Sequence, residues 1–363
     1  MNMPLIVDAH EDLAWNILAY QRDYTRPVAE TRRLETEAES PAITQQGHTL
    51  LGWDAYQQGR VAVVFSTLFV SPARKRREWE TIYYTDFNQA HKLYQQQLDL
   101  YREYTDRHHE HFQLIATRSD LESILAHWAD GTQSSHPVGW LPLMEGAEGV
   151  RSQQELEMWW DKGVHVIGPA WAGTRFCGGT GEPGPLTEDG RWLLKGMADH
   201  GFTLDVSHMD ELAARQVLDV YPGAVIASHA NAAALIPSYS GNRQLTDDFI
   251  RALVSRGGII GIIPTCPFLD YGWRRGNPRT ITLERAAAQV DHICQLAGSA
   301  EHAGIGSDFD GGFGVDVATA EVDSLADLQK LAPHLIAKGY NDEQIAAIFG
   351  GNWIRHLQAN LPS

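Results

Sequence analysis

Short runs of apolar, often β-branched residues recur along the whole chain, and segments with helical spacing separate nearly all of them. Runs of this kind, bounded by turn-forming residues, are typical of buried strands. Eight runs fit this description: residues 5–10, 61–70, 140–146, 164–171, 202–208, 224–229, 259–265 and 303–309. Apolar strands that alternate with amphipathic helices predict a parallel sheet whose outer face is covered by helices.

The segments between these runs predict amphipathic helices, and glycine closes several of them, as is common at a helix C-terminus. The predicted helices include residues 78–104, 152–163, 190–201, 210–221, 245–258, 282–298 and 323–339. Eight strand–helix units in a chain of this length favour an α/β fold of the (β/α)8 TIM-like barrel type over an open doubly wound sheet. We therefore expect one barrel domain over residues 1–363.

Two segments do not fit the strand–helix alternation. An open dinucleotide-binding sheet would need a glycine-rich loop after an early strand, but the glycines at 178–184 ("GGTGEPG") lack that context, and we expect a flexible loop there. The polar stretch at about 22–52 is too long for an ordinary turn between a strand and a helix. We expect it to form a loop or a partial helix over one end of the barrel.

The composition of the chain limits the classes of partner that it could bind. The chain has 363 residues with 43% hydrophobic content, and 29 basic against 46 acidic residues give a formal charge of −17. Such a charge argues against nucleic acid or an anionic membrane as the main partner. The three widely spaced cysteines suggest neither a disulfide framework nor a zinc knuckle. No leader-like segment or bilayer-length apolar run is visible, so we expect a cytoplasmic protein.

Ionisable side chains stand where the predicted strands end, which is where a (β/α)8 barrel carries its chemistry. Six residues share this property: His10, Asp12, Glu145, His208, His229 and Asp308. His10 and Asp12 lie two positions apart on an extended chain, so both side chains can face the barrel axis. Buried ionisable groups are costly without a partner, which makes a structural explanation of the whole set improbable.

Imidazole and carboxylate ligands together suit Zn²⁺ or a similar divalent metal. We expect His10 and Asp12 to hold one ion, His208 and His229 to hold a second, and Glu145 to bridge the two. Such a pair of ions polarises a carbonyl and lowers the pKa of a shared water, whose proton Asp308 would accept. Spacing alone does not decide between Glu145 and Glu148, or between Asp308 and Asp310.

Other residues near these strand ends suggest further roles. Arg243 follows the sixth strand and could clamp a substrate carboxylate, although an ordinary salt bridge is an equal alternative. In the first strand, Glu11 should point away from the axis and be solvated or paired at the rim. Asp8 should be a buried carboxylate that supports the ligands.

Six motifs carry a resemblance to a known family: "VDAHEDLAW", "LMEGAEGV", "LTEDGRWLLKGMADHGFTLDVSHMDE", "VIASHANAAAL", "NRQLTDD" and "GIGSDFDGG". In this order they resemble the membrane (renal-type) dipeptidases, peptidase family M19, and most closely its soluble bacterial members. The resemblance implies a (β/α)8 metallohydrolase with two Zn²⁺ ions per chain, held by His10, Asp12, Glu145, His208 and His229. It further implies Asp308 as the catalytic acid/base, Arg243 as the grip on the dipeptide carboxylate, and a possible homodimer.

Two segments depart from the family pattern. "GPAWAGTRF" places Trp171 where the family usually has a histidine that reaches the substrate carbonyl or the oxyanion. An indole N–H donates one hydrogen bond but carries no positive charge, so about 10²-fold in rate could be lost unless Arg175 compensates. After the seventh strand, "IIPTCPFLDYGW" lacks the family's frequent Asn-Phe pair.

Three functions stay open at this stage. The leading hypothesis is a zinc-dependent dipeptidase, and its substrates could include dipeptides with a C-terminal D-residue. A second hypothesis keeps the metals but changes the substrate to an N-acyl amino acid, another amide or a lactone, because Trp171 could shape a more apolar pocket. The third is a non-catalytic, metal-stabilised binding protein, against which Asp308 and Arg243 argue.

Overall fold

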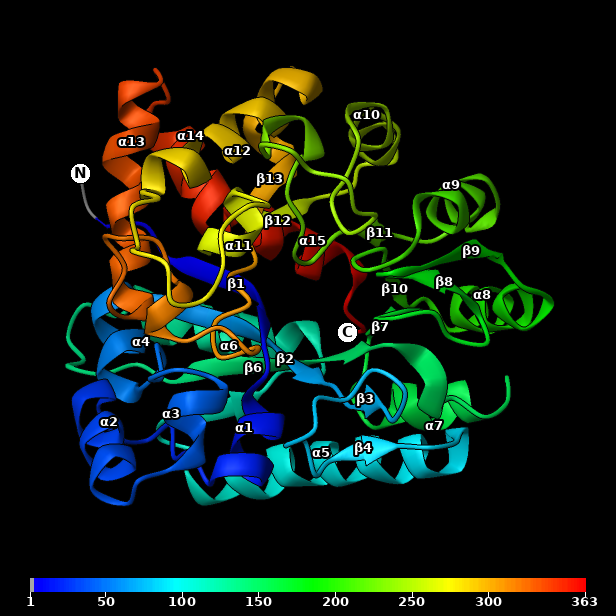
Figure 1. The fold of residues 1–363 in the computed structure, drawn as a ribbon, viewed down its shortest axis with the longest axis horizontal. Coiled ribbons are helices and arrows are strands. Elements are labelled where there is room, and N and C mark those ends of the chain that lie inside the picture. Colours follow the sequence, from blue (N-terminus) through cyan, green and yellow to red (C-terminus); the bar gives the residue numbers. More distant parts are fainter. Residues whose placement is uncertain (1–2) are drawn as a thin grey trace.

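The computed structural model describes residues 3–363, and its central feature is a ring of parallel strands (Figure 1). The eight ring strands, in chain order, are β1 Ile6–Glu11, β2 Val61–Leu68, β6 Val138–Glu145, β7 Val166–Gly168, β10 Thr203–Asp205, β11 Val225–Ile226, β12 Ile260–Ile262 and β13 Ala303–Ile305. Each lies within or overlaps one of the eight predicted runs. Most are shorter than predicted, so the polar residues that end the runs lie in loops.

The ring closes at its least regular point. Strand β1 pairs with both β2 and β13, and the path ends at β11 and β12. A single parallel bridge between Ala227 and Ile260 joins these ends. There the Ala227 amide donates to the Ile259 carbonyl at 2.9 Å and the Gly261 amide donates to Ala227 at 2.8 Å. This closing seam completes the (β/α)8 barrel that the hydrophobic pattern predicts.

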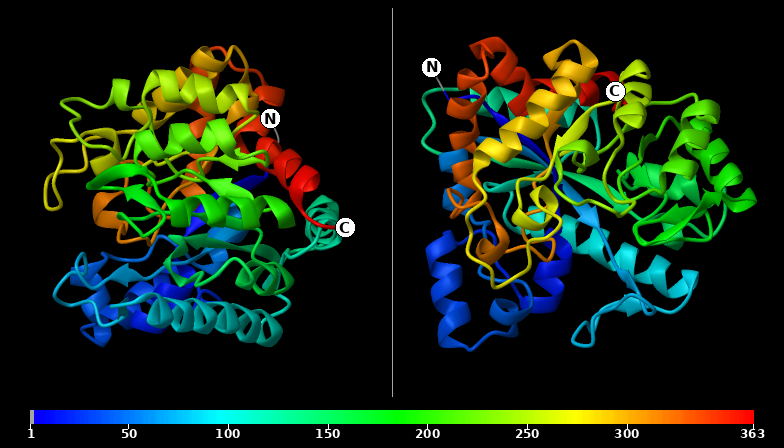
Figure 2. Two further views of the ribbon diagram at one scale, coloured as in Figure 1. Left: turned by 90° about the vertical axis from the view of Figure 1, so that its right-hand side faces the viewer. Right: turned by 45° about the horizontal axis from the view of Figure 1, so that its top comes forward.

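Helices surround the barrel in every view (Figure 2). They are α1 Leu13–Tyr20, α2 Val28–Glu37, α3 Pro41–Gln45, α4 Trp53–Gly59, α5 Phe87–Arg107, α6 Arg118–Ala129, α7 Glu155–Asp161, α8 Glu188–His200, α9 Glu211–Val220, α10 Asp247–Ser255, α11 Cys266–Leu269, α12 Leu283–Ala297, α13 Leu331–Ala337, α14 Asp342–Ala346 and α15 Asn352–Asn360. All seven predicted helices are present, and the last begins as a 3-10 segment, Leu325–Lys330. No helix within residues 3–363 has the length and apolarity needed to cross a membrane.

The predicted helix at 78–104 is wrong at its start. It begins at Phe87, where the Asp86 carboxylate caps the first turn by accepting the amides of Asn88 and Gln89. The residues before it form a strap, residues 71–86, whose ends pair as β3 Ser71–Pro72 and β4 Tyr83–Tyr84. Pairing between these distant residues overrides the helical spacing within the strap.

Two irregular segments are more ordered than expected. The glycine-rich stretch is a hairpin, β8 Cys177–Gly179 with β9 Glu182–Leu186, rather than a flexible loop. The polar stretch at 22–52 contains α2 and α3, which lie near α4 at the lower left of Figure 1. A further strand, β5 Phe112–Leu114, pairs with β6 outside the ring and was not predicted. The hairpin, the strap and the end of the polar stretch all reach the cavity described below.

Candidate metal centre and active site

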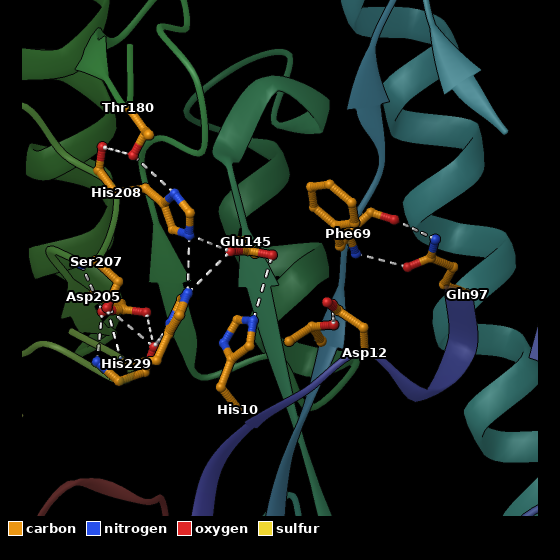
Figure 3. A network of polar contacts seen from close by, with 12 residues as sticks. His10, Asp12, Phe69, Gln97, Glu145, Thr180, Asp205, Ser207, His208 and His229 are labelled. Carbon is orange, nitrogen blue, oxygen red and sulfur yellow. Dashed lines mark hydrogen bonds and ion pairs between the residues drawn. The ribbon is translucent and has the colours of Figure 1, made fainter. Parts of the chain in front are cut away.

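Glu145 lies at the centre of the converging side chains (Figure 3). Its Oε2 lies 3.6 Å from Nε2 of His10. Its Oε1 lies 3.1 Å from Nε2 of His208 and 3.5 Å from Nε2 of His229. Because Glu145 ends β6, between the neighbouring strands β2 and β7, its carboxylate divides the site into a His10 half and a half with two histidines.

The two-histidine half is held by hydroxyl groups. The Nε2 atoms of His208 and His229 face each other at 2.9 Å. On the far side of each ring, Nδ1 of His208 lies 3.0 Å from the Thr180 hydroxyl, and Nδ1 of His229 lies 2.8 Å from the Ser228 hydroxyl. Hydrogen bonds to Nδ1 orient both rings so that Nε2 remains directed into the site.

The His10 half gathers carboxylates. His10, Asp12 and Asp308 each offer an atom such that all three lie within 4.8 Å of one another, and His10, Glu145 and His229 do the same. The Thr67 hydroxyl donates to Asp12. Asp308 follows β13 and has a positive φ of 59°, which turns its side chain away from the strand direction. We call the six converging residues the metal cluster: His10, Asp12, Glu145, His208, His229 and Asp308.

The structure separates the acids that spacing could not. Glu148 lies 3.6 Å from the Arg175 guanidinium, outside the metal cluster. Asp310 lies 2.9 Å from Arg22 and accepts a 2.6 Å hydrogen bond from the Thr49 hydroxyl. Arg22 also pairs with Glu35 at 2.8 Å, and we call these four side chains, with Tyr24 beside them, the ion-pair network.

Charge is unevenly shared among the three histidines. Burial opposes a charged His10, but the carboxylates of Glu145, Asp12 and Asp308 outweigh it and raise its pKa to about 10. Burial, reinforced by the charge of Arg243, lowers the pKa of His208 to about 4. Metal binding requires neutral imidazole, so the two-histidine half already has the right form, while the proton on His10 balances the surrounding carboxylates.

The donor set fits divalent metal ions. Both ring nitrogens of His10 are buried and have no hydrogen-bond partner in the part of the chain that is described. Two imidazole nitrogens also point at each other, and three buried carboxylates face the same space. Unpartnered buried donors and acceptors are costly, and a mixed nitrogen and oxygen set is what Zn²⁺ and similar metals bind.

Arg243 is buried beside this cluster, with 8% of its surface exposed. Its Nη2 donates to the His229 carbonyl at 2.7 Å, while Nε and Nη1 have no partner among residues 3–363. Burial lowers its pKa from the ordinary value, yet the guanidinium stays charged. The salt-bridge alternative is therefore not what the structure has, and two free donors remain for a ligand.

A cavity of about 270 Å³ opens above the metal cluster and is lined by Asp12, Glu145, His208, Arg243 and Asp308, among others. Part of its wall is aromatic, formed by Trp15, Phe69, Trp171, Phe268 and Phe313. Trp171 lies between Phe69 and His208, with ring centroids 5.1 and 6.2 Å away, and Phe268 packs against Phe313 at 5.2 Å. Trp171 thus faces the cavity, as its position after the fourth barrel strand suggested.

The structure decides two open points about nearby residues. Glu11 is paired rather than solvated, because it is fully buried and accepts a 2.6 Å hydrogen bond from the Tyr56 hydroxyl. Arg175 does not line the cavity but donates to the Glu148 and Val150 carbonyls, so it offers no replacement for a histidine at Trp171. Asp8 is buried as expected and accepts the Ser307 amide at 2.7 Å.

Several cavity residues were not predicted; Trp15 lies in α1 and Phe268 in α11, and the others come from segments with no regular pattern. The unpredicted residues are Trp15, Gln46, Phe69, Lys75, Arg77, Glu80, Thr180, Phe268, Gly311 and Phe313. One signal in the sequence pointed to some of them: residues 74–77 read "RKRR" in an otherwise acidic chain. A second was the glycine pair that follows "SDFD", since glycines permit close approach of neighbouring groups.

Residues 1–360 match the family described as membrane dipeptidase, peptidase family M19. The chain belongs to peptidase family M19. Membership in this family makes it a hydrolytic, metal-dependent dipeptidase, and the metal cluster supplies the candidate ligands. A non-catalytic binding protein is thereby set aside.

The chain is also similar to individual proteins. An uncharacterized protein in the pqqA 5′ region of Klebsiella pneumoniae is 32% identical over 225 residues, which cover 59% of this chain and 79% of the relative. Dipeptidase tcpJ of Claviceps purpurea (strain 20.1) is 27% identical over 315 residues, covering 83% and 67% of the two chains. A metallo peptidase from Rhodobacter sphaeroides, liganded with a phosphinate mimic of the dipeptide L-Ala-D-Ala, has the same fold with a TM-score of 0.78. Its sequence is 22% identical, and the aligned region covers 99% of this chain and 100% of that structure's chain.

Proposed function

We propose that this M19 enzyme is a zinc dipeptidase that cleaves the peptide bond of dipeptides, including those with a C-terminal D-residue. Two ions would be held by His10, Asp12, His208 and His229, with Glu145 between them. The observation that carries the proposal is the Glu145 carboxylate, which turns one oxygen toward His10 and the other toward the two-histidine half. The D-residue is suggested by the ligand of the Rhodobacter sphaeroides relative, a mimic of L-Ala-D-Ala.

Bound zinc would polarise the scissile carbonyl and make an attacking water more acidic. The chain's own residues would do the rest. Arg243 would grip the free carboxylate of the substrate through Nε and Nη1, which orients the peptide bond over the cluster. Burial raises the pKa of Asp308 well above its usual range, so its carboxylate is suited to take the proton of the water and pass it to the leaving amine. The aromatic walls would exclude bulk water.

The test combines metal content with turnover. We expect about two zinc ions per chain by elemental analysis, hydrolysis of some members of an L,L and L,D dipeptide panel, and a rate loss of about 10²- to 10⁴-fold in Asp308→Asn. Asp316→Asn offers a matched control, since that carboxylate pairs with Arg275 at 2.7 Å and does not line the cavity. No turnover of any dipeptide, or full activity of Asp308→Asn, would contradict the proposal.

A second substrate class is supported by the aromatic walls. Trp171 and Phe69 form an apolar face beside the two-histidine half, which would suit the acyl group of an N-acyl amino acid or another amide. In that reaction the α-amino group is dispensable. Comparing N-acetyl amino acids with dipeptides on one preparation separates the two, and a higher kcat/KM for the acetylated compounds would favour this second class.

Three further expectations from the sequence stay predictions. They are one domain over residues 1–363, a cytoplasmic location, and a possible homodimer. The three cysteines are buried and unpaired, which supports a reducing compartment. Light scattering tests the homodimer, and a single cooperative unfolding transition tests the single domain.

A further inference from the structure

The strap carries four consecutive cations in a chain whose formal charge is −17. Residues 74–77 are Arg, Lys, Arg and Arg, and two of them, Lys75 and Arg77, line the cavity above the metal cluster. Positive charge at the mouth of a cleft concentrates anionic ligands and speeds their association. A local reversal of sign at this place therefore suggests that an anionic group of the substrate passes the strap.

Three of the four cations already have partners. Arg74 donates to Oε2 of Glu182 at 2.8 Å, and the Lys75 ammonium lies 3.3 Å from Oε1 of the same carboxylate. The Arg76 guanidinium lies over the ring of Tyr83, 4.5 Å from its centroid. These contacts tie the strap to the β8–β9 hairpin and to its own β4 end.

Arg77, unlike Arg74 and Lys75, has no carboxylate partner. Its guanidinium lies 5.5 Å from the ring centroid of Trp79, and among the described residues no carboxylate oxygen comes within ion-pair distance of it. Glu80, later in the strap, also lines the cavity, and its buried Oε2 has no hydrogen-bond partner in residues 3–363. The Arg77 guanidinium and the Glu80 carboxylate thus line the same cavity.

Of two successive glycines, the first borders the metal cluster and the second borders Arg77. A Cβ on Gly311 would lie 2.1 Å from Oδ1 of Asp308 and 2.6 Å from Oδ2 of Asp12. A Cβ on Gly312 would lie 3.9 Å from both terminal nitrogens of Arg77. Without side chains at these positions, nothing from the glycine pair separates the carboxylates from the guanidinium.

Arg77 and Arg243 serve opposite ends of the site. Arg243 donates to the His229 carbonyl, in the two-histidine half, while Arg77 lies near Gly312, which follows the glycine that borders Asp12 and Asp308. In Figure 3, His229 and Asp12 lie on opposite sides of Glu145. If Arg243 holds the C-terminal carboxylate of a dipeptide, then Arg77 faces the N-terminal residue.

We propose that Arg77 selects dipeptides whose N-terminal residue has an acidic side chain. The inference rests on the proposed function and names the substrate class of that site. The side-chain carboxylate would pair with the Arg77 guanidinium, and the α-ammonium group would have Glu80 and the acids of the metal cluster nearby. Without Arg77, the cation of the strap that still lines the cavity is Lys75, which already pairs with Glu182.

The first experiment compares aspartyl-alanine with asparaginyl-alanine, which have nearly the same shape and differ in charge. We expect kcat/KM to favour the aspartyl dipeptide by about tenfold, since one charge-assisted hydrogen bond is worth that much. The preference should shrink as the ionic strength rises from about 0.01 M to about 1 M, because salt screens the partly exposed guanidinium.

Variants separate Arg77 from the rest of the strap. Arg77→Met should bring the ratio of the two kcat/KM values close to one, and Arg77→Glu should reverse the preference. Arg76→Met is the matched control, one residue away and turned toward Tyr83, and it should leave both the ratio and the basal activity unchanged. Calorimetric binding of both dipeptides to zinc-loaded Asp308→Asn should show the same preference without turnover.

The outcomes keep this inference apart from the proposed function. Hydrolysis of asparaginyl-alanine and other neutral dipeptides without an aspartyl preference would overturn the role of Arg77 and leave the dipeptidase proposal standing. A preference that persists in both Arg77 variants would also overturn it. If no dipeptide is bound or cleaved, the proposed function fails, and this inference fails with it.

Discussion

The metal cluster and the ion-pair network are two groups of buried polar side chains that treat charge in opposite ways. At β1, His10 and Asp12 enter the metal cluster, while Glu11 between them turns to Tyr56. The same alternation occurs after β13, where Asp308 enters the metal cluster and Asp310 enters the ion-pair network.

Most donors and acceptors of the ion-pair network are paired within it, and Oε2 of Glu35 is the exception. Arg22 reaches Asp310 at 2.9 Å and Glu35 at 2.8 Å, and it also donates to the Gly47 carbonyl. Asp310 further accepts the Leu50 amide at 3.0 Å. In the metal cluster, by contrast, carboxylates face carboxylates and both nitrogens of His10 lack partners. Both groups contain the same kinds of residue, so residue type does not distinguish them. The metal cluster is distinguished by facing carboxylates and by imidazole nitrogens without hydrogen-bond partners.

The largest effect is expected from Glu145→Gln, which removes the central carboxylate of the metal cluster. We expect a rate loss on the order of 10⁴-fold and a clear fall in zinc content, because ligand charge and geometry are both changed. Without metal, the variant should unfold at a temperature no lower than that of metal-free wild-type protein, because one buried carboxylate charge has been removed. Activity, elemental analysis and thermal unfolding measure this, with Glu148→Gln as the control that keeps metal and activity.

In the ion-pair network, Arg22→Met should have the opposite effect: it should lower stability and leave zinc binding intact. Removing this guanidinium leaves Asp310 and Glu35 buried without their cation, and we expect the free energy of unfolding to fall by about 3–5 kcal/mol. Zinc content of the folded fraction should persist. Denaturant titration gives the stability, and Arg33→Met, at an exposed pair with Glu37, should change it little. Equal stability of the two variants would remove the distinction between the groups.

Gly311→Ala tests how tightly the metal cluster is packed. The new methyl group would overlap Oδ1 of Asp308 and press on Asp12, so both carboxylates must move. Displacements of this size in an active site cost about 10²-fold in rate. Gly131→Ala has no atom within 4 Å of the added carbon and is the control. Unchanged kcat/KM and zinc content in Gly311→Ala would show that the carboxylates can relax without loss.

The smallest effect is expected from Tyr56→Phe, at the contact between Glu11 and its partner. Loss of this hydroxyl leaves a buried carboxyl oxygen unmatched and should cost about 1–3 kcal/mol of stability. Because Glu11 points away from the cavity, kcat/KM should stay within about twofold of wild type. A large loss of activity with normal stability would mean that the two groups are coupled through β1.

Sequence reasoning reached the barrel because its strands are buried on both faces and read as apolar runs. It reached His10, Asp12 and Glu145 because strand ends in a barrel share one face. It could not decide between Asp308 and Asp310, since the loop after β13 has positive φ at both residues, 59° and 60°, and strand alternation does not extend there. Only the position of Arg22, nearly 290 residues earlier in the chain, separates them.

The cavity walls were beyond reach for a different reason. Residues 78–86 of the strap were predicted as the start of a helix, but the strap is held by backbone pairing instead, in which the Ala73 amide donates to the Tyr84 carbonyl at 2.8 Å. Gln46, Arg77 and Phe313 meet at one cavity although they come from three separate loops. Loop contacts of this range leave no local periodicity to find.

The closing seam, between β11 and β12, also affects how the barrel can open. Its strands are short, β11 with two residues and β12 with three, and one bridge joins them. Elements with few shared backbone bonds open at lower free energy than the rest of a fold. His229 lies just after β11 and Arg243 shortly before α10, so local opening at the seam would loosen the two-histidine half first while β1 and β6 stay fixed.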